Sequence, residues 1–65
     1  MKNKCIGARI IYYRRLKQIT QKELADRLNI NRQYLSQIEN GHIICDDILL
    51  ERICQTLGIN KSHIF

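Results

Sequence analysis

The sequence predicts an all-α fold, a compact bundle of about five short helices, and three observations lead to this prediction. One capping pattern occurs four times within the 65 residues. Between the caps, apolar residues repeat with the three-and-four spacing of a single helix face. No segment alternates apolar and polar residues for long enough to form a strand. Because a chain of this length supplies one small core, we expect residues 1–65 to form a single domain.

The repeated pattern is an apolar residue, a capping residue, and a second apolar residue four positions after the cap. In this arrangement the cap side chain accepts a free backbone N–H, and the apolar pair packs across the helix entrance. Glu23 also completes a capping box with the first cap. The four occurrences are Ile19, Thr20 and Leu24; Ile30, Asn31 and Leu35; Cys45, Asp46 and Leu50; and Ile59, Asn60 and Ile64.

These caps and the apolar spacing divide the chain into helices. The first helix precedes residue 19, and its stripe consists of Ile6, Ile10, Tyr13 and Lys17, with Leu16 beside it. The next three run from about Gln21 to Leu28, from about Arg32 to Asn40 and from about Asp47 to Leu57. Gly41 and Gly58 end the last two, and a final turn follows residue 60. The expected core comprises Leu24, Ala25, Leu28, Leu35, Ile38, Leu50, Ile53, Cys54 and Leu57.

The second and third helices are separated by only about three residues, 29–31. So short a turn forces the two helices to cross sharply. Their backbones then approach closely, which requires a small side chain at the contact, and Ala25 supplies it. The turn also needs a residue that tolerates a positive φ, and Asn29 meets that need.

Charge is distributed unevenly along the chain. The net charge is +5, and residues 1–20 contain six lysines and arginines without any acidic residue. Such a basic segment favours a polyanionic partner, although a solvated basic surface would have the same composition. No apolar run approaches the roughly 18 residues of a membrane span, so we expect no membrane contact and a cytoplasmic protein. Three cysteines without a C-x-x-C pair suggest reduced thiols.

Two stretches carry a specific pattern: Gln-Lys-Glu-Leu-Ala at 21–25 and Ser-Gln-Ile-Glu-Asn-Gly at 36–41. The region from about 21 to 40 resembles the helix-turn-helix of the Cro/phage-repressor (XRE-type) family. The likeness extends from about Ile6 to Ile64. It implies a five-helix domain that binds double-stranded operator DNA, usually palindromic, as a homodimer. The implied function is that of a transcriptional regulator, specifically a repressor.

The third helix presents a polar face to such a ligand. With steps of about 100° per residue, its core side chains cluster on one side, and the opposite arc holds Gln33, Ser36 and Gln37, with Arg32 at its edge. In a helix-turn-helix the start of the second helix meets the base edges. Glutamine pairs with adenine and arginine with guanine, so these four residues are the predicted base contacts. The alternative is a merely solvated helix face.

Four other residues are predicted to contact phosphates. The resemblance implies this role for Gln21, where a helix N-terminus and an amide can jointly hold a phosphate. The resemblance also implies that Asn40, at the end of the third helix, makes a second contact with the DNA backbone. Tyr34 either reaches a phosphate or covers the edge of the core, and Arg15 supplies diffuse attraction together with Arg9 and Lys17.

Matching family positions imply that Arg14 and Glu39 form an ion pair that fixes the angle of the recognition helix; the alternative is that Arg14 meets phosphate. The chain departs from the family after Gly41, where its relatives often place basic residues and a proline. We therefore expect weaker or more partner-dependent DNA affinity. Ile43 and Ile44 either form an apolar dimerisation patch with Ile64 and Phe65 or close the core.

A second possible function is a protein-interaction module, such as an antitoxin that binds a partner protein and its operator. The non-basic loop and the apolar residues after Gly41 are consistent with it. His42 and Cys45 lack the further ligands that a zinc site requires, so we expect no metal and no cofactor. No nucleophile, base and orienting group occur together, and we expect no enzymatic activity.

Overall fold

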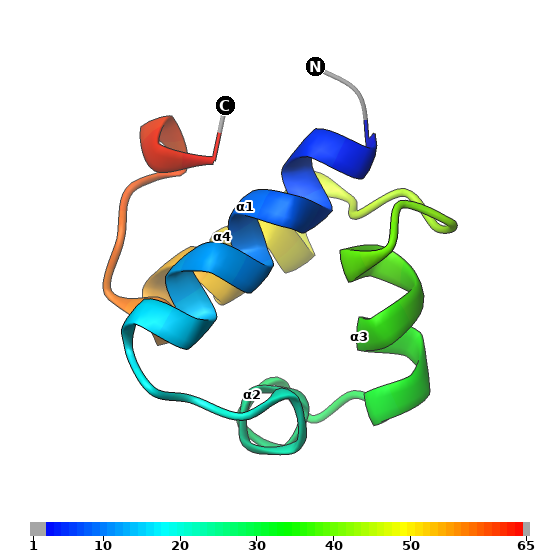
Figure 1. Ribbon diagram of the computed structural model, residues 1–65, viewed down its shortest axis with the longest axis horizontal. Coiled ribbons are helices and arrows are strands. Elements are labelled where there is room, and N and C mark those ends of the chain that lie inside the picture. Colours follow the sequence, from blue (N-terminus) through cyan, green and yellow to red (C-terminus); the bar gives the residue numbers. More distant parts are fainter. Residues whose placement is uncertain (1–2, 65) are drawn as a thin grey trace.

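The computed structural model describes residues 3–64, which form four α-helices and one short 3-10 turn (Figure 1). The elements are α1 (Asn3–Leu16), α2 (Gln21–Leu28), α3 (Arg32–Glu39), α4 (Asp47–Leu57) and η1 (Lys61–His63). The all-helical prediction is confirmed, but the expected count of about five helices is slightly too high. The last element is one turn closed by i to i+3 hydrogen bonds, from His63 N to Asn60 O and from Ile64 N to Lys61 O.

Side-chain caps start the three helices that follow α1. The hydroxyl of Thr20 accepts from the N–H of Glu23 at 3.0 Å, and the Glu23 carboxylate accepts from the Thr20 N–H at 3.1 Å. Asn31 caps α3 by accepting from Gln33 N at 2.7 Å, and Asp46 caps α4 in the same way. These bonds confirm the predicted starts of α2, α3 and α4.

The core lies where the four helices meet. In Figure 1, α1 crosses in front of α4, while α2 and α3 stand at the lower and right edges of the molecule. All nine residues that the sequence predicted for the core are buried, and Ile10, Leu49 and Ile64 join them. Ile6 and Tyr13 of the α1 stripe pack against this core, whereas Leu16 and Lys17 are exposed.

The turn between α2 and α3 has the predicted geometry. Asn29 adopts a left-handed conformation, with φ 57° and ψ 43°, and its N–H donates to carbonyls of the last turn of α2. Ala25 is fully buried at the crossing. The small side chain lets α2 and α3 approach closely, and the left-handed residue redirects the chain within three positions.

Gly7 places α1 directly against the end of α3. A Cβ atom on Gly7 would lie 2.6 Å from the carbonyl oxygen of Ile38 and closer still to that of Glu39. Such separations are shorter than real Cβ contacts, so only glycine fits here without movement of the backbone. This contact therefore sets the position of α3 relative to α1.

The apolar residues that follow Gly41 do not form the patch considered from the sequence. Ile64 is fully buried, and Ile43 is half-buried and packs against the core. Ile44 alone is exposed, and Phe65 lies outside the described residues. The prediction of a dimerisation patch that includes Ile64 is therefore wrong, because the chain after η1 turns Ile64 into the core.

The three cysteines differ in burial, and this difference makes a prediction about their reactivity. Cys5 is exposed, Cys45 is half-buried and Cys54 is buried. Burial, reinforced by the neighbouring Asp46 carboxylate, raises the pKa of Cys45 to about 11, and burial also raises the pKa of Cys54. Only about one Cys45 thiol in a thousand is then ionised at pH 8, and the thiolate is the reactive species.

We therefore expect iodoacetamide at pH 8 to alkylate Cys5 first and Cys45 and Cys54 much more slowly. Peptide mass spectrometry over a time course measures the three rates. In denaturant the three rates should converge, because burial no longer distinguishes the thiols. If Cys45 is alkylated as fast as Cys5 in the folded protein, then the Cys45 thiol is not shielded by burial.

Candidate nucleic-acid interface

The outer face of α3 is polar and open to solvent. Arg32, Gln33 and Gln37 are exposed, and Ser36 is half-buried. Leu35 and Ile38, on the opposite face of the same helix, are fully or almost fully buried. The structure thus brings together all four residues that the sequence assigned to base contact, on a helix that stands at the edge of the molecule (Figure 1).

A shallow hollow opens where the starts of α2 and α3 converge. Its volume is about 390 Å³, and it is lined by Gln21, Asn31, Arg32, Gln33 and Ser36. The first backbone N–H groups of a helix lack intrahelical partners, and the helix dipole places positive charge at the same end. Two helix starts and the Arg32 guanidinium therefore make this hollow electrostatically suited to an anionic group.

A buried ion pair supports the far end of α3. Nε of Arg14 donates to Oε2 of Glu39 at 2.8 Å, and Nη2 donates to Oε1 at 3.2 Å. The two residues are only 8% and 4% exposed, so the pair is shielded from water. A third guanidinium nitrogen, Nη1, donates to the carbonyl of Ile19 at 3.1 Å. Arg14 is therefore engaged inside the protein, and the alternative that it meets phosphate does not fit the structure.

Gln21 links this ion pair to the start of α3. Its Nε2 donates to Oε1 of Glu39 at 2.9 Å, and its Oε1 accepts from Nε of Arg32 at 3.3 Å. A continuous hydrogen-bonded chain thus runs from Arg14 through Glu39 and Gln21 to Arg32. Each end of the Gln21 amide thus makes one internal hydrogen bond, which fixes the side chain at the rim of the hollow.

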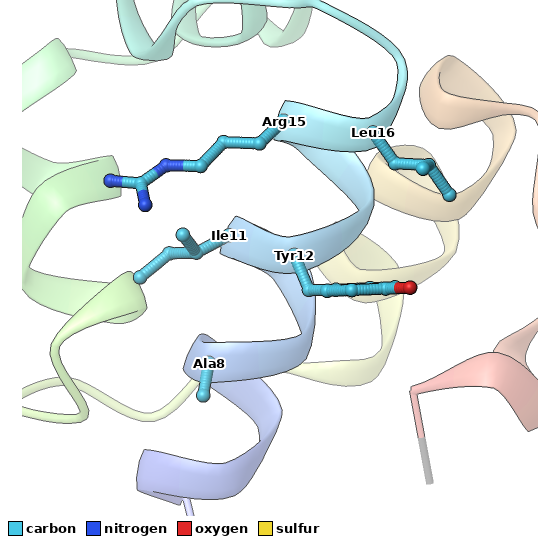
Figure 2. Close-up of a pocket in the computed structure, with 5 residues that line it drawn as sticks. All are labelled: Ala8, Ile11, Tyr12, Arg15 and Leu16. Carbon is cyan, nitrogen blue, oxygen red and sulfur yellow. The ribbon is translucent and has the colours of Figure 1, made fainter.

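The structure places the other three predicted phosphate contacts outside the hollow. Tyr34 is half-buried and packs against the core. Asn40 caps the far end of α3, which ends at Glu39 rather than at residue 40, and its Nδ2 lies 3.5 Å from the hydroxyl of Ser36. Arg15 is exposed on α1, where it lines a different hollow with Ala8, Ile11, Tyr12 and Leu16 (Figure 2).

Two features of the site were not predicted from the sequence. The first is the internal bonding of Gln21, which has no sequence signal because its partners lie 11 and 18 residues away. The second is Gly7, which positions α3. A signal for it was present, since a glycine inside a helical pattern lowers helix stability and its presence there is explained by packing.

The described residues also show what is absent. None of the helices formed by residues 3–64 is both long and apolar enough to cross a membrane. Over the same residues, no three side chains of histidine, cysteine, aspartate or glutamate gather as ligands of a metal ion would.

Comparison with known proteins places the chain among regulators. The family model described as helix-turn-helix matches residues 10–64. The chain is 36% identical over 59 residues to the immunity repressor protein of Bacillus phage phi105, a match that covers 91% of this chain but only 41% of the repressor. It is also 36% identical over 61 residues to an HTH-type transcriptional regulator of Sinorhizobium fredii, covering 94% of this chain and 77% of that protein.

Solved structures share the fold. The clp gene regulator ClgR from C. glutamicum superimposes with a TM-score of 0.92 at 29% identity, covering 95% of this chain and 80% of that one. The restriction-modification controller protein C.AhdI from Aeromonas hydrophila gives a TM-score of 0.91 at 22% identity, covering 97% and 96%, and shows the fold alone. With its capped α2 and α3, its three-residue turn and a family match over most of its length, this chain belongs to the helix-turn-helix family of DNA-binding transcription regulators.

Proposed function

We propose that this protein binds double-stranded DNA in a sequence-specific manner, with α3 lying in the major groove, and that it acts as a repressor. The observation that carries the proposal is the outer face of α3, where Arg32, Gln33 and Gln37 are exposed while the opposite face is buried. A major groove admits one α-helix, and the start of a recognition helix contacts base edges.

Each polar residue of this face has a proposed role. The side-chain amides of Gln33 and Gln37 pair with N6 and N7 of adenine, and the Arg32 guanidinium pairs with O6 and N7 of guanine. The hydrogen bond from Arg32 to Gln21 restrains the guanidinium before DNA arrives, which reduces the entropy lost on binding. Ser36 is half-buried, and its hydroxyl contacts the base edge that lies nearest to it.

Phosphates occupy the hollow between the starts of α2 and α3 in this proposal. Gln21 stands at its rim and Asn31 caps α3 beside it. The phosphate contacts orient α3 in the groove and carry no sequence information of their own, whereas the side chains of Arg32, Gln33 and Ser36, which also line the hollow, extend to the base edges. Tyr34, Asn40 and Arg15 lie outside this hollow and add general affinity for DNA.

We further propose that two copies bind two half-sites of a palindromic operator. Helix-turn-helix proteins that pair in this way read half-sites about one turn of DNA apart. The segment from Gly41 to the start of α4 contains Asp46 and Asp47 instead of basic residues, so each copy has fewer phosphate contacts available. A weak single-site affinity makes the pairing of two copies important, because linked sites bind more tightly than either site alone.

Gln33→Ala is expected to reduce selectivity more than general affinity. A bidentate base contact contributes about 1–3 kcal/mol of discrimination, so the ratio of affinities for selected and random duplexes should fall by about 5- to 150-fold. The measurement is a titration of both duplexes at several salt concentrations. The salt dependence should stay nearly unchanged, because no phosphate contact is removed.

Gln55→Ala is the matched control, since Gln55 is an exposed glutamine on α4 outside the hollow. It should change neither affinity nor selectivity. If the unaltered protein binds selected and random duplexes equally well, base reading by α3 is wrong. The alternative of an antitoxin-like interaction module is not favoured, because the relatives found are named as repressors and regulators.

A further inference from the structure

Two exposed apolar surfaces lie outside the proposed base-reading face of α3, and only Arg15, at the margin of one of them, also has a proposed part in general DNA affinity. Among the described residues, the large apolar side chains that remain exposed are Tyr12 and Leu16, each 60% exposed, and Ile44 and Ile48, at 69% and 75%. The first two lie on α1, Ile48 lies in the first turn of α4, and Ile44 lies in the loop just before that helix. Contiguous exposed apolar residues with charged neighbours are a common mark of protein contact sites.

The α1 surface consists of Ala8, Ile11, Tyr12, Arg15 and Leu16, which line a shallow hollow of about 460 Å³. These positions follow helical spacing along the side of α1 that faces away from the core. Figure 2 shows the Arg15 guanidinium extending to one side of this surface, with Tyr12 and Leu16 on the other. Because α1 contains no acidic residue, the surface is apolar with positive charge at its margin.

The α4-start surface consists of Ile44, Asp46, Asp47, Ile48 and Glu51, all of which are exposed. The two isoleucines flank the two aspartates, and Glu51 follows one turn later. Glu51 pairs with Lys61 at 3.4 Å, and the Arg52 guanidinium turns to the carbonyl of Leu28, so Asp46 and Asp47 supply the negative charge at the margin of this apolar surface.

We propose that a second copy of this chain places its α4-start surface on the α1 surface, so that the two copies associate head to tail. Pairing of two α1 surfaces would oppose Arg15 of each copy, and pairing of two α4-start surfaces would oppose their aspartates. Like charges across a contact are unfavourable, whereas the unlike pairing joins opposite charges around an apolar centre. Ile48 and Ile44 are the side chains that enter the α1 hollow.

A head-to-tail contact leaves each copy with one free surface of each kind, so it can repeat along a row of copies. The base-reading residues Arg32, Gln33 and Gln37 belong to neither surface and stay accessible. Such a row lacks a two-fold axis, so this contact joins neighbouring pairs of copies on adjacent DNA sites rather than the two copies on one palindromic operator. The contact itself requires no DNA, so it stands or fails separately from the proposed function.

A charge-reversal cycle tests this contact in the full chain without DNA. Sedimentation velocity over a range of concentrations measures the association of the unaltered protein, Arg15→Glu, Asp47→Lys and the double variant. Each single reversal should weaken association about tenfold, and the double reversal should restore it to within about threefold. Association of the unaltered protein should also weaken as salt is added, because exposed charges are screened.

Arg27→Glu is the control, because it makes the same charge change at an exposed position of α2 outside both surfaces. Leu16→Ser and Ile48→Ser provide uncharged variants at exposed positions, and each should also weaken association. Circular dichroism shows whether every variant is folded. The proposal is overturned if the unaltered protein stays monomeric at all concentrations, if the double reversal is weaker than either single one, or if the control weakens association equally.

Discussion

Glu39→Ala is expected to destabilise the protein by about 3–5 kcal/mol, which is a large part of the total stability of a domain this small. The carboxylate of Glu39 accepts three hydrogen bonds, two from Arg14 and one from Gln21. Its removal leaves the Arg14 guanidinium, which is 8% exposed, with only the Ile19 carbonyl as a partner. An unpaired buried charge is costly because water no longer solvates it.

Urea unfolding followed by circular dichroism measures this loss. Glu51→Ala is the matched control, since Glu51 pairs with Lys61 at 3.4 Å on the surface and should change stability by less than about 1 kcal/mol. The double variant Arg14→Met and Glu39→Leu should recover most of the stability, because it removes both charges and keeps apolar volume. A Glu39→Ala protein as stable as the Glu51→Ala protein would show that the pair does not stabilise the fold.

Gly7→Ala is expected to destabilise the protein by about 2 kcal/mol or more, although alanine is the better helix former by about 1 kcal/mol. The added methyl group would meet the carbonyl oxygens of Ile38 and Glu39. Both are backbone atoms at the end of α3, so no side-chain rotation can relieve the contact. Either α1 or α3 must move, and the angle of α3 changes with it.

Two measurements separate the effects of this substitution. Thermal unfolding reports the loss of stability, and DNA titration well below the unfolding temperature reports the displacement of α3 in molecules that remain folded. Ala8→Gly is the control, because it makes the reverse change at the adjacent exposed position and costs only the helix-propensity difference of about 1 kcal/mol. A Gly7→Ala protein that melts at or above the temperature of the unaltered chain is incompatible with so close a contact.

Gly7 and the Arg14–Glu39 pair lie in one region, the junction of α1 with the end of α3. Gly7 sets how near the helices lie, and the Arg14–Glu39 pair sets how α3 is held once it is there. From Glu39 the hydrogen bonds continue through Gln21 to Arg32, at the start of the same helix. The stability of the core and the placement of a proposed base-reading side chain are therefore connected through four residues.

Local sequence patterns were enough to place the helices that carry the site. The starts of α2, α3 and α4 were readable because a cap bonds to a backbone N–H only two or three residues away. The core faces were readable because helical geometry fixes which neighbours share a side. The left-handed Asn29 and the buried Ala25 followed from the length of a three-residue turn. All of these depend on interactions within about one turn of helix.

The packing of the whole helices determines which distant residues meet. It engaged both ends of the Gln21 amide and brought Gly7 against α3, through partners 11 to 32 residues away in the chain. It also buried Ile64 while leaving Ile44 exposed, although both are isoleucines beside a helix start or turn. Local patterns assign a side chain to a helix face, but the packing of whole helices determines what that face then contacts.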